Sequence, residues 1–386
     1  MRIYRHTFAE INLEHLAHNY REIKKRLAPG QFVCPMVKAN GYGHGDIDIS
    51  LRLQSEGVGT LGVGLVEEGL LLRHSGIQCQ LLVFGIFDYE GAQEIIKNRL
   101  TPVISTWQQL EALRKTQFYK IPVHLKFDTG MHRLGFQKAD CDKLLIFFKD
   151  NKNFLVEGVL THLSHGEDAD QANGNSSNQF KEFKEILQLM NFESNPKVIK
   201  HCLNSAGFLK SLGTPIGQYG VRPGLIIYGS YPFDTNLINL KPVMSLRSHV
   251  VTYQKIKKGE GVSYNHTWKA PVDTIIGVIP LGYADGYHRL LSNNAEVLFQ
   301  GKRVKMVGNV CMDYVMIDVT EVLKDKNLDQ FIESEVTFFG EDQAGNILSV
   351  TELSKQGGTI PWEILTSVGE RVPRVTTAQA AIGLAK

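Results

Sequence analysis

A lysine followed closely by glycines is the first residue of the sequence that could do chemistry. Lys38 lies in the segment VKANGYGHG and shares one side of an expected strand with Cys34 and Met36, because side chains alternate along a strand. A lone lysine in such a place usually reaches back to the surface. Here the glycines that follow allow close approach of the backbone to another group. A lysine removed from water has a lowered pKa and can form a Schiff base, so carbonyl chemistry is the corresponding hypothesis.

A second candidate region is the segment VHLKFDTGMHRLGF. Its alternation places His124, Lys126 and Asp128 together on one face of a strand, and Arg133 follows just beyond the strand. Ionisable groups that share one side of a buried strand must pair or hydrogen-bond. An internal salt-bridge cluster and a functional role therefore stand about even for any one of them.

Polar side chains also follow the expected strands farther along the chain. His162 ends one strand, and His201, Asn204 and Ser205 end the next. Arg222 lies in VRPG, just ahead of the last expected strand. Ser205 precedes an expected helix, so its hydroxyl and the helix N-terminus could bind an anion. For both histidines, a buried and hydrogen-bonded ring is a more common structure than a catalytic one.

The C-terminal part of the chain offers tyrosines instead. Tyr264 lies in SYNHTW and Tyr283 in LGYADGYHR, while Met312 and Asp313 lie in GNVCMDY. Tyrosines in β domains usually pack with a bonded hydroxyl, so the pattern alone does not make Tyr264 catalytic.

A repeated alternation of strand and helix patterns would position the N-terminal candidates. Short apolar, β-rich runs alternate with segments of helical spacing such as INLEHLAHNYREIKKRL and NQFKEFKEILQLM. This pattern predicts an α/β fold, a parallel (β/α)8 TIM barrel that ends near residue 235, with its active site at the C-terminal ends of the strands. The expected strands cover 32–39, 60–65, 81–85, 101–105, 122–128, 156–163, 199–205 and 224–229.

After about residue 240 the pattern changes. Strand-like runs such as DTIIGVIPL and DYVMIDV are separated by Gly, Asn and Asp turns, which is typical of a mostly antiparallel β domain. No low-complexity linker separates the two parts, so we expect them to pack firmly. The domains are predicted at 1–238 and 239–386.

Composition limits the classes of protein. The 386 residues exceed one ordinary domain, and a net charge of +2 from 42 basic and 40 acidic residues argues against a nucleic-acid partner. No apolar run approaches the roughly 20 residues that span a bilayer. The first residues lack the apolar core of a signal peptide. The 5 cysteines are scattered, which indicates reduced thiols in a cytoplasmic protein.

Taken together, these segments resemble alanine racemase, a fold-type III pyridoxal-phosphate (PLP) enzyme family. The likeness covers nearly the whole chain and includes AEINLEHLAHNY, VKANGYGHG, FDTGMHRLGF, VRPGLIIYG, IPLGYADGYHR and VGNVCMDYVMIDV. VKANGYGHG alone is shared with few families, and the ordered set is highly specific. The resemblance implies a bacterial cytoplasmic enzyme that interconverts L-alanine and D-alanine for peptidoglycan.

The family's roles can be carried over to matching positions. By resemblance, Lys38 holds PLP and moves a proton on one face of the substrate, and Tyr264 of the partner subunit acts on the opposite face, in an obligatory homodimer with composite sites. Arg222 would bind the pyridine nitrogen, with His162 as its neighbour. The other implied positions are Tyr42, Asn204, Ser205, Gly224, Leu225 and Trp362 around the cofactor, Arg133, Met312, Asp313 and Tyr283 around the amino-acid substrate, and Lys126 as a carbamylated lysine.

The chemistry agrees with these roles. Racemisation removes a proton from one face and returns one to the other, so two bases must flank the reacting carbon. PLP acts as the electron sink. An arginine does not release its proton to the pyridine nitrogen, which should suppress side reactions. Tyr264 would need a pKa about three units below its ordinary ~10, which corresponds to roughly 4 kcal/mol.

The sequence departs from the family pattern at three positions. Trp362 replaces a tyrosine, Asn265 replaces a glycine after the catalytic tyrosine, and Asn309 replaces an arginine before CMD. The change at Trp362 motivates an alternative hypothesis, a serine or broad-specificity racemase. A further alternative is a non-catalytic PLP-binding protein, although such proteins resemble only the first ~230 residues, a length typical of one barrel domain.

Overall fold

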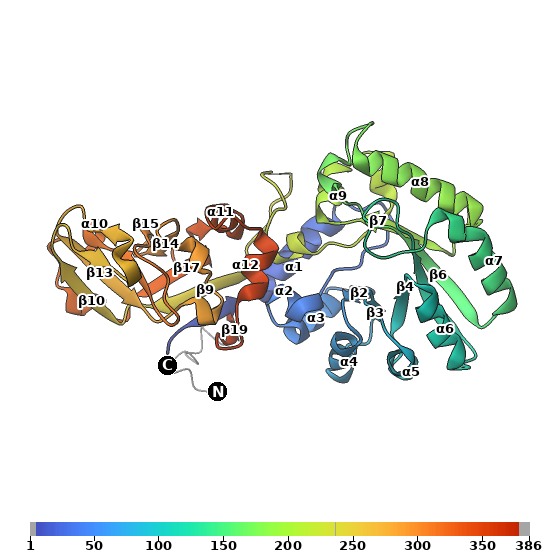
Figure 1. Cartoon of the computed structure of the whole chain (residues 1–386), viewed down its shortest axis with the longest axis horizontal. Helices are drawn as coiled ribbons and strands as arrows, with labels where there is room; N and C mark the ends of the chain where they lie inside the picture. Colours follow the sequence, from blue (N-terminus) through green and yellow to red (C-terminus); the bar gives the residue numbers. More distant parts are fainter. Residues whose placement is uncertain (1–4, 236, 378–386) are drawn as a thin grey trace.

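The computed structural model describes residues 5–235 and 237–377, and it places two bodies end to end (Figure 1). The first body is a parallel barrel whose main sheet has the strand order β2-β3-β4-β5-β6-β7-β8. Residues 33–36 close the ring, because Val33 pairs in parallel with Val221 and Met36 with Gly62. The predicted TIM-barrel fold is confirmed. The strands are β2 (Thr60–Val63), β3 (Gln80–Val83), β4 (Thr101–Ile104), β5 (Ile121–Lys126), β6 (Phe154–Leu160), β7 (Ile199–Leu203) and β8 (Gly220–Val221).

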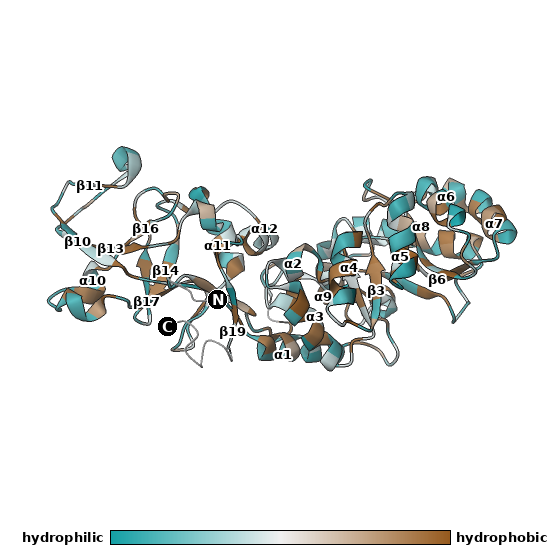
Figure 2. Cartoon of the chain, turned by 90° about the horizontal axis from the view of Figure 1, so that it is seen from below, coloured by the Kyte–Doolittle hydropathy of each residue, from teal (hydrophilic) through white to brown (hydrophobic). Residues whose placement is uncertain are grey.

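Helices surround this barrel. Those on its outside are α3 (Asp46–Ser55), α4 (Val66–His74), α5 (Tyr89–Lys97), α6 (Trp107–Lys115), α7 (Cys141–Asp150) and α8 (Asn175–Leu189). In Figure 2 the inner strand β3 is hydrophobic, whereas α5 shows many hydrophilic residues. In α5 only Ala92 and Ile95 are buried, and the side chain of Asp88 caps the helix by accepting the N–H of Gly91 at 2.9 Å. A one-sided helix of this kind buries its apolar stripe against the sheet.

The prediction of a strand over 224–229 was wrong. Leu225–Tyr228 form the short 3₁₀ helix η4, and all of its residues are buried. A short, continuous apolar run cannot be assigned to a strand or a buried helix from its pattern alone. The true last strand, β8, ends at Val221. Arg222 therefore follows a barrel strand, at the end where such barrels place their active sites.

The second body is built mainly from antiparallel strands, as predicted. Its largest sheet has the order β15-β14-β17-β9-β1-β19, with β18 paired to β17, beside a sheet β10-β13-β16 and the hairpin β11-β12. The strands are β9 (Met244–His249), β10 (Thr252–Ile256), β11 (Gly261–Val262), β12 (Trp268–Lys269), β13 (Thr274–Ile279), β14 (Glu296–Phe299), β15 (Lys302–Lys305), β16 (Val315–Asp318), β17 (Glu335–Glu341), β18 (Ile347–Leu348) and β19 (Arg374–Thr376). The helices here are α10 (Thr320–Leu323), α11 (Val350–Gln356) and α12 (Pro361–Ser367).

The first strand of the chain belongs to this second sheet. β1 (Phe8–Ile11) pairs antiparallel with β9 and parallel with β19, although the predicted range 1–238 assigned it to the barrel. A strand's partners lie far away in the sequence, so alternation within four residues carries no information about them. After β1, the helix α1 (Leu13–Lys24) leads into the barrel. Residues 1–4, 236 and 378–386 of the predicted ranges lie outside the described residues.

Arg374 fastens the two bodies together. Its guanidinium donates to the carbonyl of Gly43, at the end of the short helix α2 (Lys38–Tyr42), and to the carbonyls of Gly369 and Val372. The backbone of α12 also lies close to Gly43, because a Cβ added to Gly43 would lie 2.2 Å from the carbonyl oxygen of Leu365. The segment that carries Lys38 is therefore anchored to the second body. No helix within residues 5–235 and 237–377 has the length and apolarity to cross a membrane.

Replacing Arg374 by methionine should therefore weaken the whole fold. Arg374→Met keeps a long apolar side chain but leaves several carbonyl groups without their charged donor, each worth about 1.5–3 kcal/mol. We expect the free energy of unfolding to fall by about 3 kcal/mol or more in urea denaturation. Arg303→Met is the matched control, since it removes an exposed ion pair with Glu352 and should cost at most about 1 kcal/mol. Equal losses in the two variants would contradict this role.

Candidate active site

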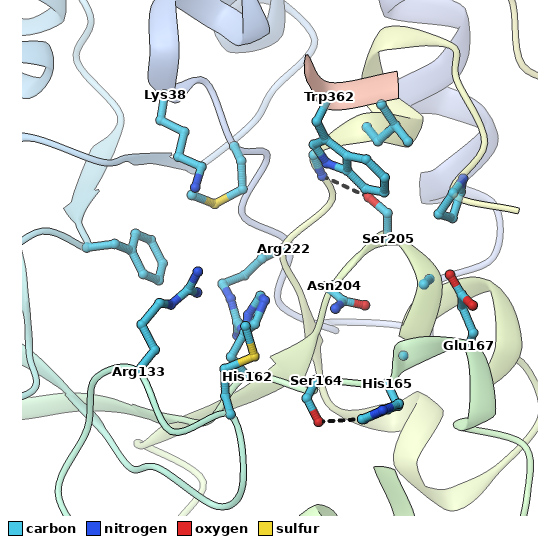
Figure 3. Close-up of a pocket in the computed structure, with 18 of the residues that line it drawn as sticks. Lys38, Arg133, His162, Ser164, His165, Glu167, Asn204, Ser205, Arg222 and Trp362 are labelled. Atoms are coloured by element: carbon cyan, nitrogen blue, oxygen red, sulfur yellow. Dashed lines mark hydrogen bonds between the residues drawn. The ribbon is translucent and has the colours of Figure 1, made fainter. Parts of the chain in front are cut away.

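A cavity of about 1310 Å³ opens at the C-terminal ends of the barrel strands (Figure 3). Its walls come from the ends of several strands and from α12 of the second body. The residues predicted for the site that line it are Lys38, Tyr42, Lys126, Arg133, His162, Asn204, Ser205, Arg222, Gly224, Leu225 and Trp362. Side chains distant in the sequence thus meet in one place.

Lys38 stands at the start of a left-handed turn. The residues after it, Ala39, Asn40, Gly41 and Tyr42, have φ values of 53°, 53°, 59° and 52°. A left-handed conformation costs roughly 1–2 kcal/mol for each residue other than glycine, so other contacts must hold this turn. One is the side chain of Asn40, which accepts the N–H of Asp46 at 3.0 Å. Burial, aided by the charge of Arg133, lowers the pKa of Lys38, while Glu68 opposes this shift.

Arg222 is the hydrogen-bonding centre of the barrel mouth. Its Nη1 donates to Nδ1 and to the carbonyl of His201, at 3.0 and 2.9 Å, and its Nη2 donates to the carbonyl of Thr161 at 2.8 Å and to Nδ1 of His162 at 3.2 Å. Burial lowers the pKa of Arg222 to about 10, so the guanidinium stays charged at neutral pH. Because a guanidinium only donates, both imidazoles must accept at Nδ1. Burial and the charge of Arg222 hold the pKa of both histidines well below its usual range, so both rings are neutral.

A third histidine extends this network into the barrel. With Nδ1 of His201 accepting, its Nε2–H donates to Nδ1 of His124 at 2.9 Å. The contact requires glycine at position 158, since a Cβ there would lie 2.2 Å from Nδ1 of His124. Asp128 instead accepts the backbone N–H groups of Gly130 and His132. The alternative of an internal salt-bridge cluster on this strand was therefore wrong, because His124, Lys126 and Asp128 form no ion pair with one another.

Cationic side chains line the cavity, which also contains the carboxylates of Glu167 and Asp168. Within the described part of the chain, Lys38, Lys126, Arg133 and Arg222 take part in no ion pair, and the side chain of Lys126 also makes no hydrogen bond. Burial and the charges of Arg133 and Arg222 lower the pKa of Lys126 to about 8. A cavity of this kind attracts anionic ligands.

One side of the cavity has the form of an anion cradle. The hydroxyl of Ser205, the first residue of α9 (Ser205–Lys210), accepts the N–H of Gly224 at 3.1 Å, and Leu225 begins η4 beside it. A Cβ on Gly224 would lie 2.4 Å from the hydroxyl of Tyr42, so only glycine leaves this space open. Burial raises the pKa of Tyr42 to about 12, which keeps its hydroxyl a neutral donor.

Asn204 and Trp362, which were also predicted near the cofactor, differ in how their polar groups are bonded. The amide of Asn204 is used by the fold, since its Oδ1 accepts the N–H of Gly207 at 2.8 Å and its Nδ2 donates to the carbonyl of Leu163 at 3.2 Å. Trp362 lies across the cavity wall beside Ser205 (Figure 3). Its indole N–H has no hydrogen-bond partner within residues 5–235 and 237–377.

The predicted residues of the second body lie outside this cavity. Tyr264 and Met312 are 67% and 53% exposed, and the β11-β12 hairpin that carries Tyr264 stands at the end of the second body away from the barrel (Figure 2). Hydrogen bonds of the segment 309–313 hold Tyr264 and Tyr283 near Met312 and Asp313. The side chain of Asn309 donates to the carbonyl of Tyr264 at 2.7 Å, Tyr283 donates its N–H to the carbonyl of Cys311 at 3.0 Å, and Arg371 binds Asp313 at 2.7 Å.

The loop around Tyr264 explains one departure from the family pattern. Ser263, Asn265 and His266 have φ values of 64°, 63° and 46°. Asparagine visits the left-handed region more readily than other residues with a side chain. Asn265 therefore adopts a conformation for which glycine is the usual choice.

The sequence reasoning missed Glu68, which contacts the Lys38 turn. Its carboxylate accepts the N–H of Ala39 at 2.7 Å and those of Gly64 and Leu65 at 2.6 and 3.0 Å. The signal in the sequence was an acidic residue in the first turn of a helix, which is common in proteins. Glu67 beside it carries the same signal without these contacts.

Comparison with known proteins identifies the relatives of this chain. The family model of the alanine racemase N-terminal domain matches residues 11–232, and that of the alanine racemase C-terminal domain matches residues 243–376. The chain belongs to the alanine racemase family. An alanine racemase from Carboxydothermus hydrogenoformans is 36% identical over 382 residues, which are 96% of this chain and 99% of the relative.

Solved structures give the same result. The alanine racemase of E. faecalis has a TM-score of 0.86 and 30% identity, covering 98% of this chain and 100% of the other. The alanine racemase of Bartonella henselae with covalently bound pyridoxal phosphate has a TM-score of 0.83 and 28% identity, covering 96% of this chain and 99% of the other.

The lowered pKa of Lys126 should appear in the pH dependence of stability. Between about pH 8 and the ordinary pKa of 10.5 the unfolded chain binds a proton at Lys126 that the folded chain does not, so stability rises with pH. The free energy of unfolding of the wild type should rise relative to Lys126→Met in this window, by at most about 1.4 kcal/mol per pH unit. Urea denaturation of the cofactor-free protein in buffers without CO₂ measures this. Trp362→Phe, which removes no titrating group, is the control, and parallel curves for wild type and Lys126→Met would refute the shift.

Proposed function

We propose that this cavity interconverts L-alanine and D-alanine with PLP as cofactor. The observation that carries the proposal is Lys38, whose amine points into a cationic cavity between an anion cradle and the guanidinium of Arg222. The lowered pKa of Lys38 suits both covalent attachment to a carbonyl compound and proton transfer. Membership of the alanine racemase family supports the reaction and the substrate.

The chemistry of the donors fits PLP. Tyr42, Ser205 and the backbone at Gly224 and Leu225 would hold the phosphate, in the space that a Cβ at Gly224 would fill. Arg222 would donate to the pyridine nitrogen, and Lys38 would bind the cofactor covalently. When bound, PLP supplies an acceptor for the electron pair left at the substrate's α-carbon after deprotonation. The covalently bound cofactor of the Bartonella henselae relative supports this assignment.

The residues of the barrel supply one half of a two-base reaction. Lys38 would take or return the α-proton at Nζ on one face of the substrate. Arg133 would bind the substrate carboxylate, for which its unpaired guanidinium is suited. Arg222 stays protonated because its pKa is about 10, and the neutral His162 and His201 fix its orientation from behind.

The second base must come from elsewhere, since Tyr264 does not line the cavity of its own chain. We assign this role to Tyr264 of the partner subunit, in a homodimer with composite active sites. Met312 and Asp313 of the partner subunit would accompany it at the substrate, with Tyr283 of the partner subunit at the entrance. The cations of the barrel mouth would then lie near the phenol, where positive charge stabilises the phenolate form that a base requires.

Lys126 is proposed to react with CO₂. A neutral amine forms an N–C bond to the carbon of CO₂ and loses a proton, which leaves a carbamate anion. The lowered pKa of Lys126 increases the fraction of neutral amine near neutral pH, and the resulting anion would face Arg133. Carbamylation would thus reduce the excess positive charge of the cavity.

The proposed biological role is supply of D-alanine for peptidoglycan in the bacterial cytoplasm. Free thiols suit a reducing compartment. The cysteines in the structure are all unpaired, namely Cys34, Cys79, Cys141, Cys202 and Cys311. A non-catalytic PLP carrier is disfavoured, because the match to the family extends through the second body. A serine or broad-specificity racemase is likewise not favoured by the relatives, which are named alanine racemases.

Mixing two inactive variants tests the composite site. Lys38→Ala removes the barrel base and Tyr264→Phe removes the second base, so each variant alone should be inactive. A mixed dimer contains one site in which both bases are intact. After subunit exchange, random pairing should restore about a quarter of the wild-type rate of D-alanine formation.

The matched control for this experiment pairs two variants of the barrel. In a mixture of Lys38→Ala with Arg222→Ala every site lacks one barrel residue, so no activity should return. Recovery in the control, or none in the test mixture, would show that Tyr264 and Lys38 do not meet across subunits. Wild-type activity in Lys38→Ala would overturn the function itself.

A panel of amino acids tests the substrate. We expect racemisation of alanine to exceed that of serine and lysine by at least about tenfold in kcat/KM, since pockets commonly discriminate small side-chain differences to this extent. Trp362→Tyr should raise the relative rate on serine, because a smaller ring widens the cavity wall. Equal wild-type rates on the three substrates would favour the broad-specificity alternative.

A further inference from the structure

The carboxylate of Glu68 joins two strand ends of the barrel. Glu68 lies in the first turn of α4, after β2, and its Oε2 accepts the N–H groups of Gly64 and Leu65. These two bonds are ordinary capping of a helix N-terminus. The third bond is not, because Oε1 accepts the N–H of Ala39, which belongs to the neighbouring strand end.

The hydrogen bond to the N–H of Ala39 stabilises a residue with an unfavourable backbone conformation. Ala39 is the first residue of the left-handed turn and directly follows Lys38. A left-handed conformation is unfavourable for alanine and persists only where its surroundings fix it. A charged acceptor at 2.7 Å is among the stronger hydrogen bonds available for this purpose.

The same carboxylate lies beside the side chain of Lys38. A Cβ added to Gly64 would lie 3.3 Å from Oε2 of Glu68 and 3.6 Å from Cδ of Lys38, so the lysine runs past the bare glycine next to Glu68. The two form no ion pair within 4 Å. The negative charge nevertheless raises the pKa of Lys38, against burial and the charge of Arg133.

We propose that Glu68 is a positioning residue for Lys38, which holds the left-handed turn through Ala39 and places a carboxylate beside the Lys38 side chain. It acts through Lys38 and does not itself exchange a proton with the substrate. This inference rests on the proposed function of Lys38. Its geometric part is measurable in a protein that has no racemase activity.

Hydrogen exchange of backbone amides tests the geometric part. In Glu68→Gln the side chain keeps its size, but one of its two acceptor atoms becomes a donor and the charge is lost. In the full chain we expect the amide of Ala39, and those of Gly64 and Leu65, to exchange at least about tenfold faster, with the rest of the barrel unchanged. Glu67→Gln, on the same helix turn with an exposed side chain, is the matched control.

The charge of Glu68 is tested by the pH profile of Lys38. A small amine-reactive compound modifies Lys38 in the cofactor-free chain at a rate that follows the fraction of Lys38 whose amine is neutral. Without the carboxylate, the midpoint of this profile should move to lower pH in Glu68→Gln and stay in place in Glu67→Gln. Glu68→Asp keeps the charge but has a shorter reach, so its midpoint should stay near the wild-type value while the Ala39 amide exchanges faster.

Activity provides a third measurement in the PLP-loaded enzyme. We expect kcat of Glu68→Gln to fall by about tenfold or more, while KM changes by less than about twofold because Arg133 is untouched. Exchange and pH profiles equal to those of Glu67→Gln would overturn the proposal, and so would faster exchange spread over the whole barrel. An inactive wild type with the expected exchange pattern would instead overturn the proposed function alone.

Discussion

Unpaired positive charge at the barrel mouth is the constraint to which the rest of the site responds. Arg222 is 4% exposed and is held by carbonyl groups and imidazoles, with no carboxylate within ion-pair distance. Burial and the charge of Arg222 keep His162 and His201 neutral, and burial with the charges of Arg133 and Arg222 lowers the pKa of Lys126. Buried charge without a partner is costly, so the cavity gains stability from an anion. A phosphate, a substrate carboxylate and a carbamate are all anions of the required kind.

The turn that follows Lys38 is held by contacts with three parts of the chain. The side chain of Asn40 binds the start of α3, Glu68 binds Ala39 from α4, and Arg374 binds Gly43 from the second body. The contacts of Glu68 and Arg374 are made to backbone atoms at the turn, that of Asn40 is made by its side chain, and none of the three involves the amine of Lys38. The turn can therefore be rigid while the Lys38 side chain remains free to move between cofactor and substrate.

Local patterns in the sequence predicted much of this architecture, and pairings between distant segments account for what they did not. The barrel, the β domain, the placement of Lys38 at a strand end and that of Lys126 on a barrel strand follow from alternation and position. Arg222 was expected ahead of a strand and instead follows one, β8. The position of β1 does not, because its partners β9 and β19 lie more than 200 residues away. The left-handed turn was signalled only by Gly41 and Asn40, and the contacts of Glu68 by nothing that separates it from Glu67. The apolar run 225–228 is equally consistent with a strand and a buried helix.

The loop that carries Tyr264 is held in a fixed conformation that leaves the tyrosine ring exposed. A packing tyrosine would bury its ring, whereas Tyr264 is 67% exposed, on a loop with three left-handed residues around it. The loop is nevertheless well held, because Asn309 donates to the carbonyl of Tyr264 and the hydroxyl of Ser263 donates back to the carbonyl of Asn309 at 2.7 Å. Strained residues that are firmly fixed gather where function requires a set geometry. A firmly held loop that presents a solvated phenol is consistent with the proposed site completed by a second subunit. Asn309, where the family resemblance led us to expect an arginine, contributes through its hydrogen bond to the backbone of the loop.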